Sequence, residues 1–504
     1  MQSQPNILLI MADQLTPFLT GVYGHPEVKT PNLDRLATEG IRFDAAYSPC
    51  PVCAPARACL MTGRHMSRIG AYDNGAGFGF DQPTFAHYLT LAGYDTALAG
   101  KMHFIGPDQL HGFTRRFNTN IYPAGFDWTP QRGLEYVSER AHALKYLGEA
   151  VHVGRWSDYL SYDEETHLRA REYLRAKGVE RRKAKEGQME ASKPFFLCTS
   201  YHHPHEPFWP PQAYWDLYEG RPIAVPEFPE NLEDTYTILD RWLNTNHGVA
   251  KAPGLRNPKS MRRLRRAYYA LVSYIDDKVG ELLSTLHESG LDQDTIVVFT
   301  SDHGDMLVER GMVQKRCFYE WSSRVPLIVR FPDGWLAGTT RPEPVSLIDL
   351  APTFLDMAGV PEENRLPVDG SSLVSLLDDS DREGWEAISE YHSQGAHTPC
   401  FMIRQGDYKY VYIHGYPDRQ LFDLRADPGE WSNLAGKPQT QEIQTRLENH
   451  LLELFDPDAI DAAIQDSIAR RQLIKRAMQV TGQRWDAEPH LDPHIGILEA
   501  YLEH

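Results

Sequence analysis

The stretch NILLIMADQ (Asn6–Gln14) begins with a run that is apolar after its first residue, and it ends on a carboxylate and an amide. A continuous apolar run of this length is typical of a strand buried on both faces, as in a parallel sheet covered by helices. Polar groups directly after such a strand lie at the carboxyl edge of the sheet, where α/β proteins bind their ligands. The stretch therefore predicts both a fold class and the place of a site.

The rest of the chain repeats this pattern of strand-length apolar runs separated by helical segments. The further strands that we expect are 41–47, 95–99, 194–199, 295–300 and 325–330. A short helix is predicted over 30–40, because Pro31 stands near its start and Gly40 at its end, and another over 84–92. This alternation predicts an α/β fold with a mostly parallel central sheet flanked by helices.

The pattern changes after about residue 378. Short antiparallel strands are predicted there at 401–404, 408–413 and 420–424, and 461–480 has apolar residues at helical spacing. We therefore expect a catalytic α/β domain over residues 1–378 and a smaller C-terminal α+β domain over 379–504. The end of the second domain is expected to serve as an oligomerisation tail, with a homodimer or homotetramer as the assembly.

The composition limits the classes of function. Asp and Glu number 69 against 51 Lys and Arg, a formal net charge of −18, so the chain is expected to repel nucleic acid and anionic lipid. No run approaches the roughly 18 apolar residues of a membrane-spanning helix. The N-terminal segment lacks the basic and apolar regions of a signal peptide, and six cysteines in 504 residues are too few for a disulfide scaffold. We therefore expect a cytoplasmic protein with no membrane or nucleic-acid partner.

Polar clusters follow four of the predicted strands. They are Asp13-Gln14, Lys101 with His103, His205 in a histidine-rich run, and Asp302-His303. One such residue is often only a cap or a solvated side chain, but four clusters at strand ends indicate a single site at one edge of the sheet. Carboxylate and amide oxygens suit a hard divalent ion, with Ca²⁺ expected and Mn²⁺ or Mg²⁺ as alternatives. The basic groups suit an anionic sulfate or phosphate ester.

The stretch CPVCAPARA (Cys50–Ala58) contains a C-x-x-C pair. A redox dithiol is expected at a helix N-terminus in a thioredoxin-like βαβ unit, whereas this pair lies inside a large α/β chain. No second pair is present to complete a four-cysteine zinc site. We therefore expect Cys50 to pack in the core, as free cysteines often do.

A second pattern in the same stretch is more specific. Cys53-Ala-Pro-Ala-Arg57, followed by Thr62-Gly-Arg64, resembles the sulfatase signature C-x-P-x-R…T-G-R. Other motifs occur in that family's order, namely Asp13-Gln14, Gly100-Lys-Met-His103, Pro204-His-Glu-Pro207, Ser301-Asp-His-Gly304 and Lys315. The resemblance covers about residues 5–436. It implies an alkaline-phosphatase-like fold and a formylglycine, made from Cys53 by a formylglycine-generating maturation enzyme.

The resemblance also implies roles for individual residues. The implied metal ligands are Asp13, Gln14, Asp302, His303 and the modified Cys53, and the implied catalytic residues are Cys53, Arg57, Lys101, His103, His205 and Lys315. The hydrated aldehyde would attack the sulfur of a sulfate ester after losing a proton to Asp302. His205 and Lys315 would protonate the leaving oxygen, and His103 would deprotonate the second hydroxyl to release sulfate. Arg57 and Lys101 would hold residue 53 and the sulfate oxygens.

Within the sulfatases, the chain resembles the choline sulfatases. The residues that carry this likeness are Ala12-Asp-Gln-Leu15, Tyr122-Pro123, Phe126-Asp-Trp-Thr-Pro130, Glu390-Tyr391 and Arg484-Trp-Asp486 with Pro489. The regions 132–156 and 492–504 depart from that group. A small alkyl sulfate ester similar to choline sulfate is therefore the expected substrate, and Trp128, Glu390 and Phe18 are candidates to receive a quaternary ammonium group. Trp128 could equally belong to the core, and Glu390 could pair with an arginine.

Three alternatives stay open on the sequence. An arylsulfatase, or a phosphonate monoester or phosphodiester hydrolase, would use the same scaffold and the same charged groups. A non-catalytic binding protein would have lost part of the ligand set, whereas every expected ligand and base is present. A thiol oxidoreductase would depend on both Cys50 and Cys53.

Overall fold

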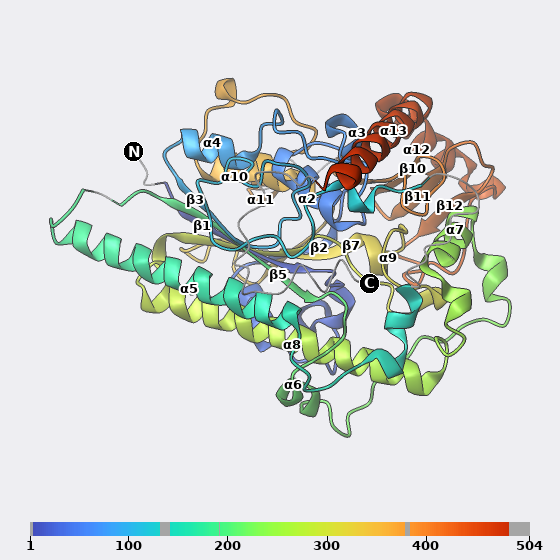
Figure 1. The fold of residues 1–504 in the computed structure, drawn as a ribbon, viewed down its shortest axis with the longest axis horizontal. Coiled ribbons are helices and arrows are strands. Elements are labelled where there is room, and N and C mark those ends of the chain that lie inside the picture. The colour runs from blue at the N-terminus through green and yellow to red at the C-terminus, as the bar shows by residue number, and fades with distance from the viewer. Residues whose placement is uncertain (1–3, 132–141, 191, 379–383, 483–504) are drawn as a thin grey trace.

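The computed structural model describes residues 4–131, 142–190, 192–378 and 384–482 (Figure 1). At its centre is an eight-stranded sheet with the order β4-β3-β5-β1-β6-β7-β2-β8. The strands are β1 (Asn6–Asp13), β2 (Ile41–Tyr47), β3 (Asp95–Gly100), β4 (Arg115–Arg116), β5 (Phe195–Pro204), β6 (Thr295–Ser301), β7 (Arg324–Arg330) and β8 (Thr339–Ser346). Neighbours are parallel except where β7 meets β6 and β2. The expectation of a mostly parallel central sheet is confirmed.

Strand β1 lies in the middle of this sheet, between β5 and β6. Its side chains alternate between two buried cores. Ile7, Leu9 and Met11 belong to the core on one face, and Leu8 and Ile10 belong to the core on the other. Because both faces are covered, the strand needs apolar residues at every position, which explains why its sequence shows no polar alternation.

Helices cover both faces of the sheet (Figure 1). The long helices α5 (Asp158–Lys185) and α8 (Pro258–Glu288) pack together on one face, with α1 (Pro31–Thr38) beside α8. The other face carries α2 (Cys53–Thr62), α4 (Phe85–Leu91) and α10 (Leu350–Met357). Shorter helices are α3 (Met66–Ile69), α6 (Gln212–Asp216), α7 (Ile238–His247), α9 (Glu320–Ser323) and α11 (Val374–Leu377).

The C-terminal part forms a second, antiparallel sheet with the order β12-β11-β10-β9. Its strands are β9 (Glu386–Tyr391), β10 (Cys400–Gln405), β11 (Tyr408–Ile413) and β12 (Arg419–Asp423). Helix α12 (Gln441–Leu454) covers one face of this sheet. On the other face, Met402, Val411 and Phe422 belong to the same buried core as Leu60 of α2. The two sheets therefore share apolar packing instead of meeting at a polar boundary.

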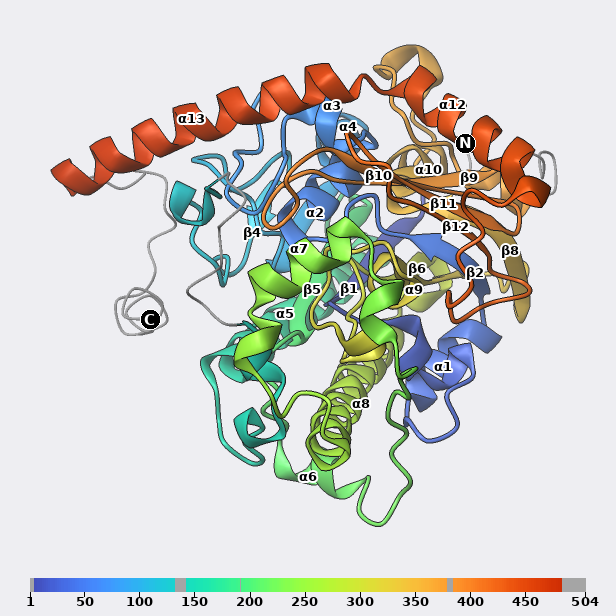
Figure 2. The same cartoon turned by 90° about the vertical axis from the view of Figure 1, so that its right-hand side faces the viewer.

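Helix α13 (Pro457–Thr481) leaves this C-terminal part and lies along the outside of the molecule, past α3 (Figure 2). It confirms the helix predicted over 461–480. The predicted motif at 484–489 and the end of the chain at 492–504 lie outside the described residues. Among the described helices, none is long and apolar enough to span a membrane.

Candidate active site

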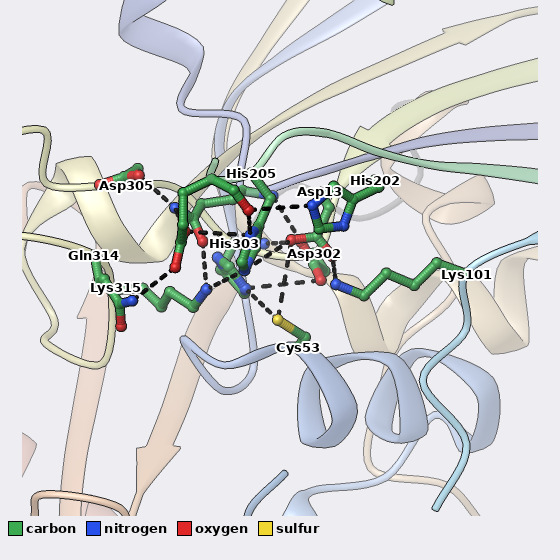
Figure 3. A network of polar contacts seen from close by, with 12 residues as sticks. Asp13, Cys53, Lys101, His202, His205, Asp302, His303, Asp305, Gln314 and Lys315 are labelled. Atoms are coloured by element: carbon green, nitrogen blue, oxygen red, sulfur yellow. Dashed lines mark hydrogen bonds and ion pairs between the residues drawn. The ribbon is translucent and has the colours of Figure 1, made fainter. Parts of the chain in front are cut away.

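Four neighbouring strands bring their polar ends to one edge of the central sheet (Figure 3). Asp13 ends β1, Lys101 follows β3, His205 follows β5 and Asp302 follows β6. Because β3, β5, β1 and β6 are adjacent and parallel, these residues meet although they are far apart in the sequence. The structure thus brings together at one edge the clusters that the sequence places after its strands.

Cys53 reaches this edge as the first residue of α2. The helix ends at Gly63, whose φ of 69° is the left-handed conformation that favours glycine, so the T-G-R motif marks the helix end. The Cys53 Sγ lies 3.1 Å from the Nε2 of His303 and 3.9 Å from the Oδ1 of Asp13. Donor atoms of Asp13, Cys53, Asp302 and His303 all lie within 4.8 Å of one another, and all four residues are buried.

This buried group fits a divalent cation. Two carboxylates and an imidazole are a donor set that hard and borderline divalent ions accept. The Nδ1–H of His303 donates to the carbonyl of Gly304 over 2.9 Å, which leaves the Nε2 lone pair directed at the cluster. Metal-binding histidines are commonly oriented by a hydrogen bond of this kind. The chemistry and the orientation of the donors are therefore those of a metal site, without specifying the ion.

Arg57 joins the two carboxylates of this group. Its side chain is fully buried, and its Nε donates to Asp302 over 2.8 Å while its Nη2 donates to Asp13 over 2.9 Å. The Nη1 donates to the Ser200 hydroxyl over 2.8 Å and to the carbonyl of Lys101. The guanidinium thus fixes the positions of Asp13 and Asp302 and offsets their charge.

Lys101 adds a second buried positive charge. Its Nζ lies 2.5 Å from the Oδ2 of Asp13 and 4.3 Å from the centre of the Tyr122 ring. Burial acts to raise the pKa of Asp13, but Lys101, His205 and Arg57 outweigh it and hold that pKa well below its usual value. Asp13 is therefore ionised at neutral pH and able to bind a cation.

His103 lies in an aromatic environment beside this lysine. Its ring centre is 5.0 Å from that of Tyr122 and 5.4 Å from that of Trp128. Both of its ring nitrogens are buried and have no hydrogen-bond partner among the described residues. Burial, and then the charges of Lys101 and Arg57, lower the pKa of His103 well below its usual value. The imidazole is therefore neutral and free to accept a proton.

His205 and Lys315 form a proton-donating pair on the other side of the cluster (Figure 3). The Lys315 Nζ donates to the His205 Nε2 over 2.9 Å. Burial and the Lys315 charge lower the pKa of His205. Burial also acts to lower the pKa of Lys315, but electrostatic interactions with Cys53, Glu206 and Asp13 outweigh it and leave that pKa raised. The proton therefore resides on the lysine.

Gln14 faces this pair. Its amide oxygen accepts from the Lys315 Nζ, and its Nε2 donates to Glu206 over 3.1 Å and to the hydroxyl of Tyr146 over 3.0 Å. Within the group of Asp13, Cys53, Asp302 and His303, its backbone N–H donates to Asp302 over 3.1 Å. The amide oxygen expected as a metal ligand is thus engaged by a lysine in this arrangement.

The three candidates for binding the alcohol group lie in different places. Trp128 lies beside His103, as described above. Glu390 is buried in β9, where its Oε2 accepts a hydrogen bond from the Nε2 of His392 over 2.9 Å and its Oε1 accepts from the Ser67 N–H over 3.4 Å. Phe18 stacks on Trp321 with ring centres 5.1 Å apart. Of the three, Trp128 is the one with ring contacts to an expected catalytic residue.

Two residues near the site were not chosen from the sequence. Tyr122 was noted only as part of a motif, yet its ring lies 5.0 Å from Trp128, 5.7 Å from His202 and 6.0 Å from His205. His202 stacks on Tyr159 at 4.3 Å. The histidine-rich run after β5 was the available signal for His202, whereas nothing in the sequence placed the Tyr122 ring under Lys101.

The C-x-x-C pair is not a disulfide. All six cysteines are free and buried. Cys50 belongs to the apolar core next to α2, and burial raises the pKa of its thiol well above the usual value. An inert core thiol is what these observations describe, in agreement with the sequence expectation.

Known proteins match the chain over most of its length. The family model described as sulfatase matches residues 5–360, and that of the N-sulphoglucosamine sulphohydrolase C-terminal region matches residues 308–456. A choline-sulfatase of Rhizobium meliloti (strain 1021) is 39% identical over 498 residues, which cover 96% of this chain and 94% of that protein. An arylsulfatase of Clostridium perfringens (strain 13 / Type A) is 30% identical over 471 residues, covering 89% of this chain and 94% of that protein.

The fold is also found in solved structures. The phosphonate monoester hydrolase of Agrobacterium radiobacter superposes with a TM-score of 0.66 at 24% identity, covering 89% of this chain and 95% of that one. This likeness shows a shared fold. The helix-flanked mixed sheet with a smaller C-terminal sheet is thus a fold that the chain shares with this solved structure.

Proposed function

The chain belongs to the sulfatase family, and from that premise we propose that it hydrolyses the sulfate ester of a small alcohol, choline sulfate or a close analogue. It is a sulfuric ester hydrolase; the alcohol, the formylglycine and the metal are the proposed part. The observation that carries the proposal is the buried group of Asp13, Cys53, Asp302 and His303, with Cys53 at the start of a helix. The 39% identity to a choline-sulfatase over nearly the whole chain supports the choice of alcohol.

Cys53 is proposed to become formylglycine. In the environment that the chain itself provides, burial and then the Asp13 carboxylate raise the pKa of the Cys53 thiol to about 11, so the unmodified side chain is a poor nucleophile at neutral pH. Cys53 is only 1% exposed, so the maturation enzyme must reach it before the fold closes. When present, the hydrated aldehyde supplies an oxygen nucleophile and the divalent cation supplies charge that stabilises an oxyanion.

The surrounding side chains orient the ester and move protons. Asp13, Asp302 and His303 are proposed to hold the cation, with Gln14 as a further ligand once its amide leaves Lys315. Lys101 and Arg57 offset the negative charge of the sulfate. Lys315 protonates the departing alcohol oxygen, and His205 stands next to it to return the proton.

His103 is proposed as the base in the second proton transfer, which releases sulfate. Its nitrogens have no hydrogen-bond partner among the described residues, and its lowered pKa keeps it neutral. It therefore accepts the proton whose removal allows sulfate to depart. The acid, Lys315, lies in the segment after β6 and the base, His103, in the segment after β3, so the two proton-transfer roles belong to separate groups.

Trp128 is proposed to receive the alcohol group. Its ring adjoins His103, and an indole face attracts a quaternary ammonium by about 0.5–2 kcal/mol. Burial acts to raise the pKa of Glu390, but the hydrogen bond and charge of His392 outweigh it, so Glu390 keeps a negative charge that attracts a cationic alcohol at longer range. Phe18 has no part in this proposal.

A phosphonate monoester or phosphodiester is the second candidate substrate. Such an ester carries one negative charge, as a sulfate ester does, so the same cationic edge would receive it. The fold shared with a phosphonate monoester hydrolase favours including these substrates. An arylsulfate is included on the similarity to an arylsulfatase.

Mass spectrometry and a substrate panel test the proposal together. The native protein should show residue 53 as an aldehyde, with its sulfur replaced by oxygen and two hydrogens fewer than a serine would have, and Cys53→Ala should abolish turnover. Cys50→Ala is the matched control, because it removes a buried thiol three residues away and should keep most of the activity. The panel compares kcat/KM for choline sulfate, an aryl sulfate and a phosphodiester. Full activity with only unmodified cysteine at residue 53 would contradict the nucleophile, and a higher kcat/KM on the aryl ester would contradict the alcohol.

A further inference from the structure

The segment that carries Trp128 is held from outside by helix α13. The Lys475 Nζ donates to the backbone carbonyl of Asp127 over 2.7 Å, and the Gln472 Nε2 donates to that of Pro130 over 3.1 Å. These two residues lie on the same side of α13, three apart. The C-terminal helix thus contacts the backbone on both sides of Trp128.

A buried ion pair anchors the same helix to the body of the enzyme. The Arg471 Nη1 and Nη2 donate to the two carboxylate oxygens of Asp73 over 2.8 and 2.9 Å. Arg471 is 4% exposed and Asp73 is 1% exposed. The Arg471 Nη1 also reaches the Thr129 hydroxyl at 3.4 Å. A bidentate arginine–carboxylate pair restricts the relative orientation of the two side chains more than a single hydrogen bond does.

The loop that contains Asp73 contacts both the Trp128 segment and the nucleophile helix. Gly75 packs so closely on that segment that a side chain there would overlap the backbone of Trp128 and Thr129. The Asn74 Oδ1 accepts from the N–H of Ala54, the residue after Cys53, over 3.0 Å. Asp73 itself accepts from the Gly75 N–H over 2.8 Å. Three consecutive residues thus link α13, the proposed alcohol-binding wall and the start of α2.

We propose that Arg471 is a positioning residue for the alcohol-binding side of the active site. Its ion pair with Asp73 fixes the position of the 73–75 loop, against which the backbone of Trp128 packs. This inference deepens the proposed function, because it takes Trp128 as the wall that meets the alcohol. The surrounding patch of α13 is apolar, formed by Ile464 and Ile468 against Tyr72 and Ala76. Two apolar residues in place of the whole Arg471–Asp73 pair would serve packing there as well as the ion pair does, so the pair fits a geometric role better than a purely stabilising one.

Arg471→Met tests the proposal, with Arg470→Met as its matched control. Arg470 is the neighbouring arginine, is exposed and pairs only with Asp466 among the described residues, over 3.0 Å. For the sulfate ester that the wild type turns over best, Arg471→Met should raise KM about tenfold, a loss of about 1.4 kcal/mol in binding, and should change kcat by less than about threefold. Arg470→Met should leave both constants unchanged. A folded Arg471→Met enzyme with wild-type KM would overturn the inference.

Lys475→Met provides a second, milder test should Arg471→Met not fold. Lys475 is partly exposed and lies outside the buried core, so its substitution should leave the core intact while removing the contact with the Asp127 carbonyl. We expect KM to rise about two- to threefold, in the same direction as for Arg471→Met. A wild-type KM in this variant, with Arg471→Met unfolded, refutes the positioning role.

The panel separates this inference from the proposed function. If the wild type prefers another ester, the proposal that choline sulfate is the substrate is contradicted. The Arg471 test stays valid in that case, because KM is then measured on the preferred ester. A loss in Arg471→Met that appears in kcat alone, equally for esters of every alcohol, would instead show an effect on the sulfate side and would overturn the inference.

Discussion

Replacing Arg57 by methionine is the most direct test of how the buried charges are balanced. The substitution keeps much of the side-chain length and removes the guanidinium that joins Asp13 and Asp302 at 2.9 and 2.8 Å. All three side chains are fully buried. Breaking a buried ion pair by removing one partner costs about 3–5 kcal/mol, because the remaining charge is left uncompensated.

This cost translates into a measurable change in Tm. Unfolding entropy is about 2.1 cal/mol/K per residue, so a chain of 504 residues has a total of about 1 kcal/mol/K. Each kcal/mol therefore lowers Tm by about 1 °C, and Arg57→Met should lower Tm by about 3–5 °C. The activity should fall as well, because Asp13 and Asp302 lose the group that fixes their positions.

Chelation sharpens the measurement. Without Arg57, the charge of the two carboxylates would be offset only by neighbouring groups such as Lys101 and by the proposed divalent cation, so EDTA should lower the Tm of the variant by more than it lowers that of the wild type. Differential scanning calorimetry with and without EDTA gives both values. The control is Arg68→Met, which removes a partly exposed pair with Asp369 and should shift Tm by less than about 1 °C. Equal EDTA shifts in wild type and Arg57→Met would refute the account of a shared charge balance.

Two further predictions concern the surroundings of the site. Tyr122→Leu removes the ring that faces Lys101 at 4.3 Å, an interaction worth about 0.5–2 kcal/mol, and should lower kcat by about 2- to 30-fold. Tyr122→Phe keeps the ring and should stay near wild type in steady-state assays; equal losses in both variants would count against the ring. Burial raises the pKa of Asp349 from 3.8 to about 7, against hydrogen bonds from the N–H groups of Ser346 and Ser371. A raised carboxyl pKa stabilises the fold at low pH, and this contribution is lost as pH rises from about 4 through about 7. Denaturant unfolding should therefore show a smaller loss of stability between pH 5 and 8 for Asp349→Asn than for the wild type, and parallel pH curves would contradict this.

The strands predicted from the sequence are those whose composition reflects complete burial. Every side chain of β1 from Ile7 to Asp13 is buried, and β6 is buried throughout, so both show as apolar runs that end in polar groups. The amino-acid composition of a strand does not indicate whether it runs parallel or antiparallel to its neighbours. Strand β7 has the same apolar character as its neighbours and yet runs antiparallel to β6. Its direction depends on how the connecting loop returns, which no local pattern encodes.

Three strands escaped prediction. One of them, β4, is only two residues long, and the other two, β8 and β9, have residues that are not typical of strands. Strand β8 reads TTRPEPVS and contains two prolines. It is the last strand of the sheet, and proline is tolerated in an edge strand because one side of it has no ladder to complete. Strand β9, EAISEY, mixes charged and apolar residues because it carries Glu390 into a buried hydrogen bond with His392.

Motif spacing identified which residues meet, but not how each side chain is directed. Gln14 has a φ of 64°, and this backbone conformation, together with Lys315 and Glu206, determines where its amide lies. Arg471 and Asp73 are 398 residues apart, and each lies in a segment with no motif. Contacts of this kind depend on tertiary packing, which a single sequence does not reveal.

The core shared by the two sheets has a consequence for biosynthesis. Met402, Val411 and Phe422 belong to the same apolar core as Leu60 of α2, so the core that contains the helix beginning with Cys53 is complete only after β10 to β12 have left the ribosome. The maturation enzyme that we propose for Cys53 would therefore have the time taken to translate most of the chain in which to act. The C-terminal sheet, which is synthesised late, would then complete the core around the nucleophile helix only after the proposed conversion of Cys53.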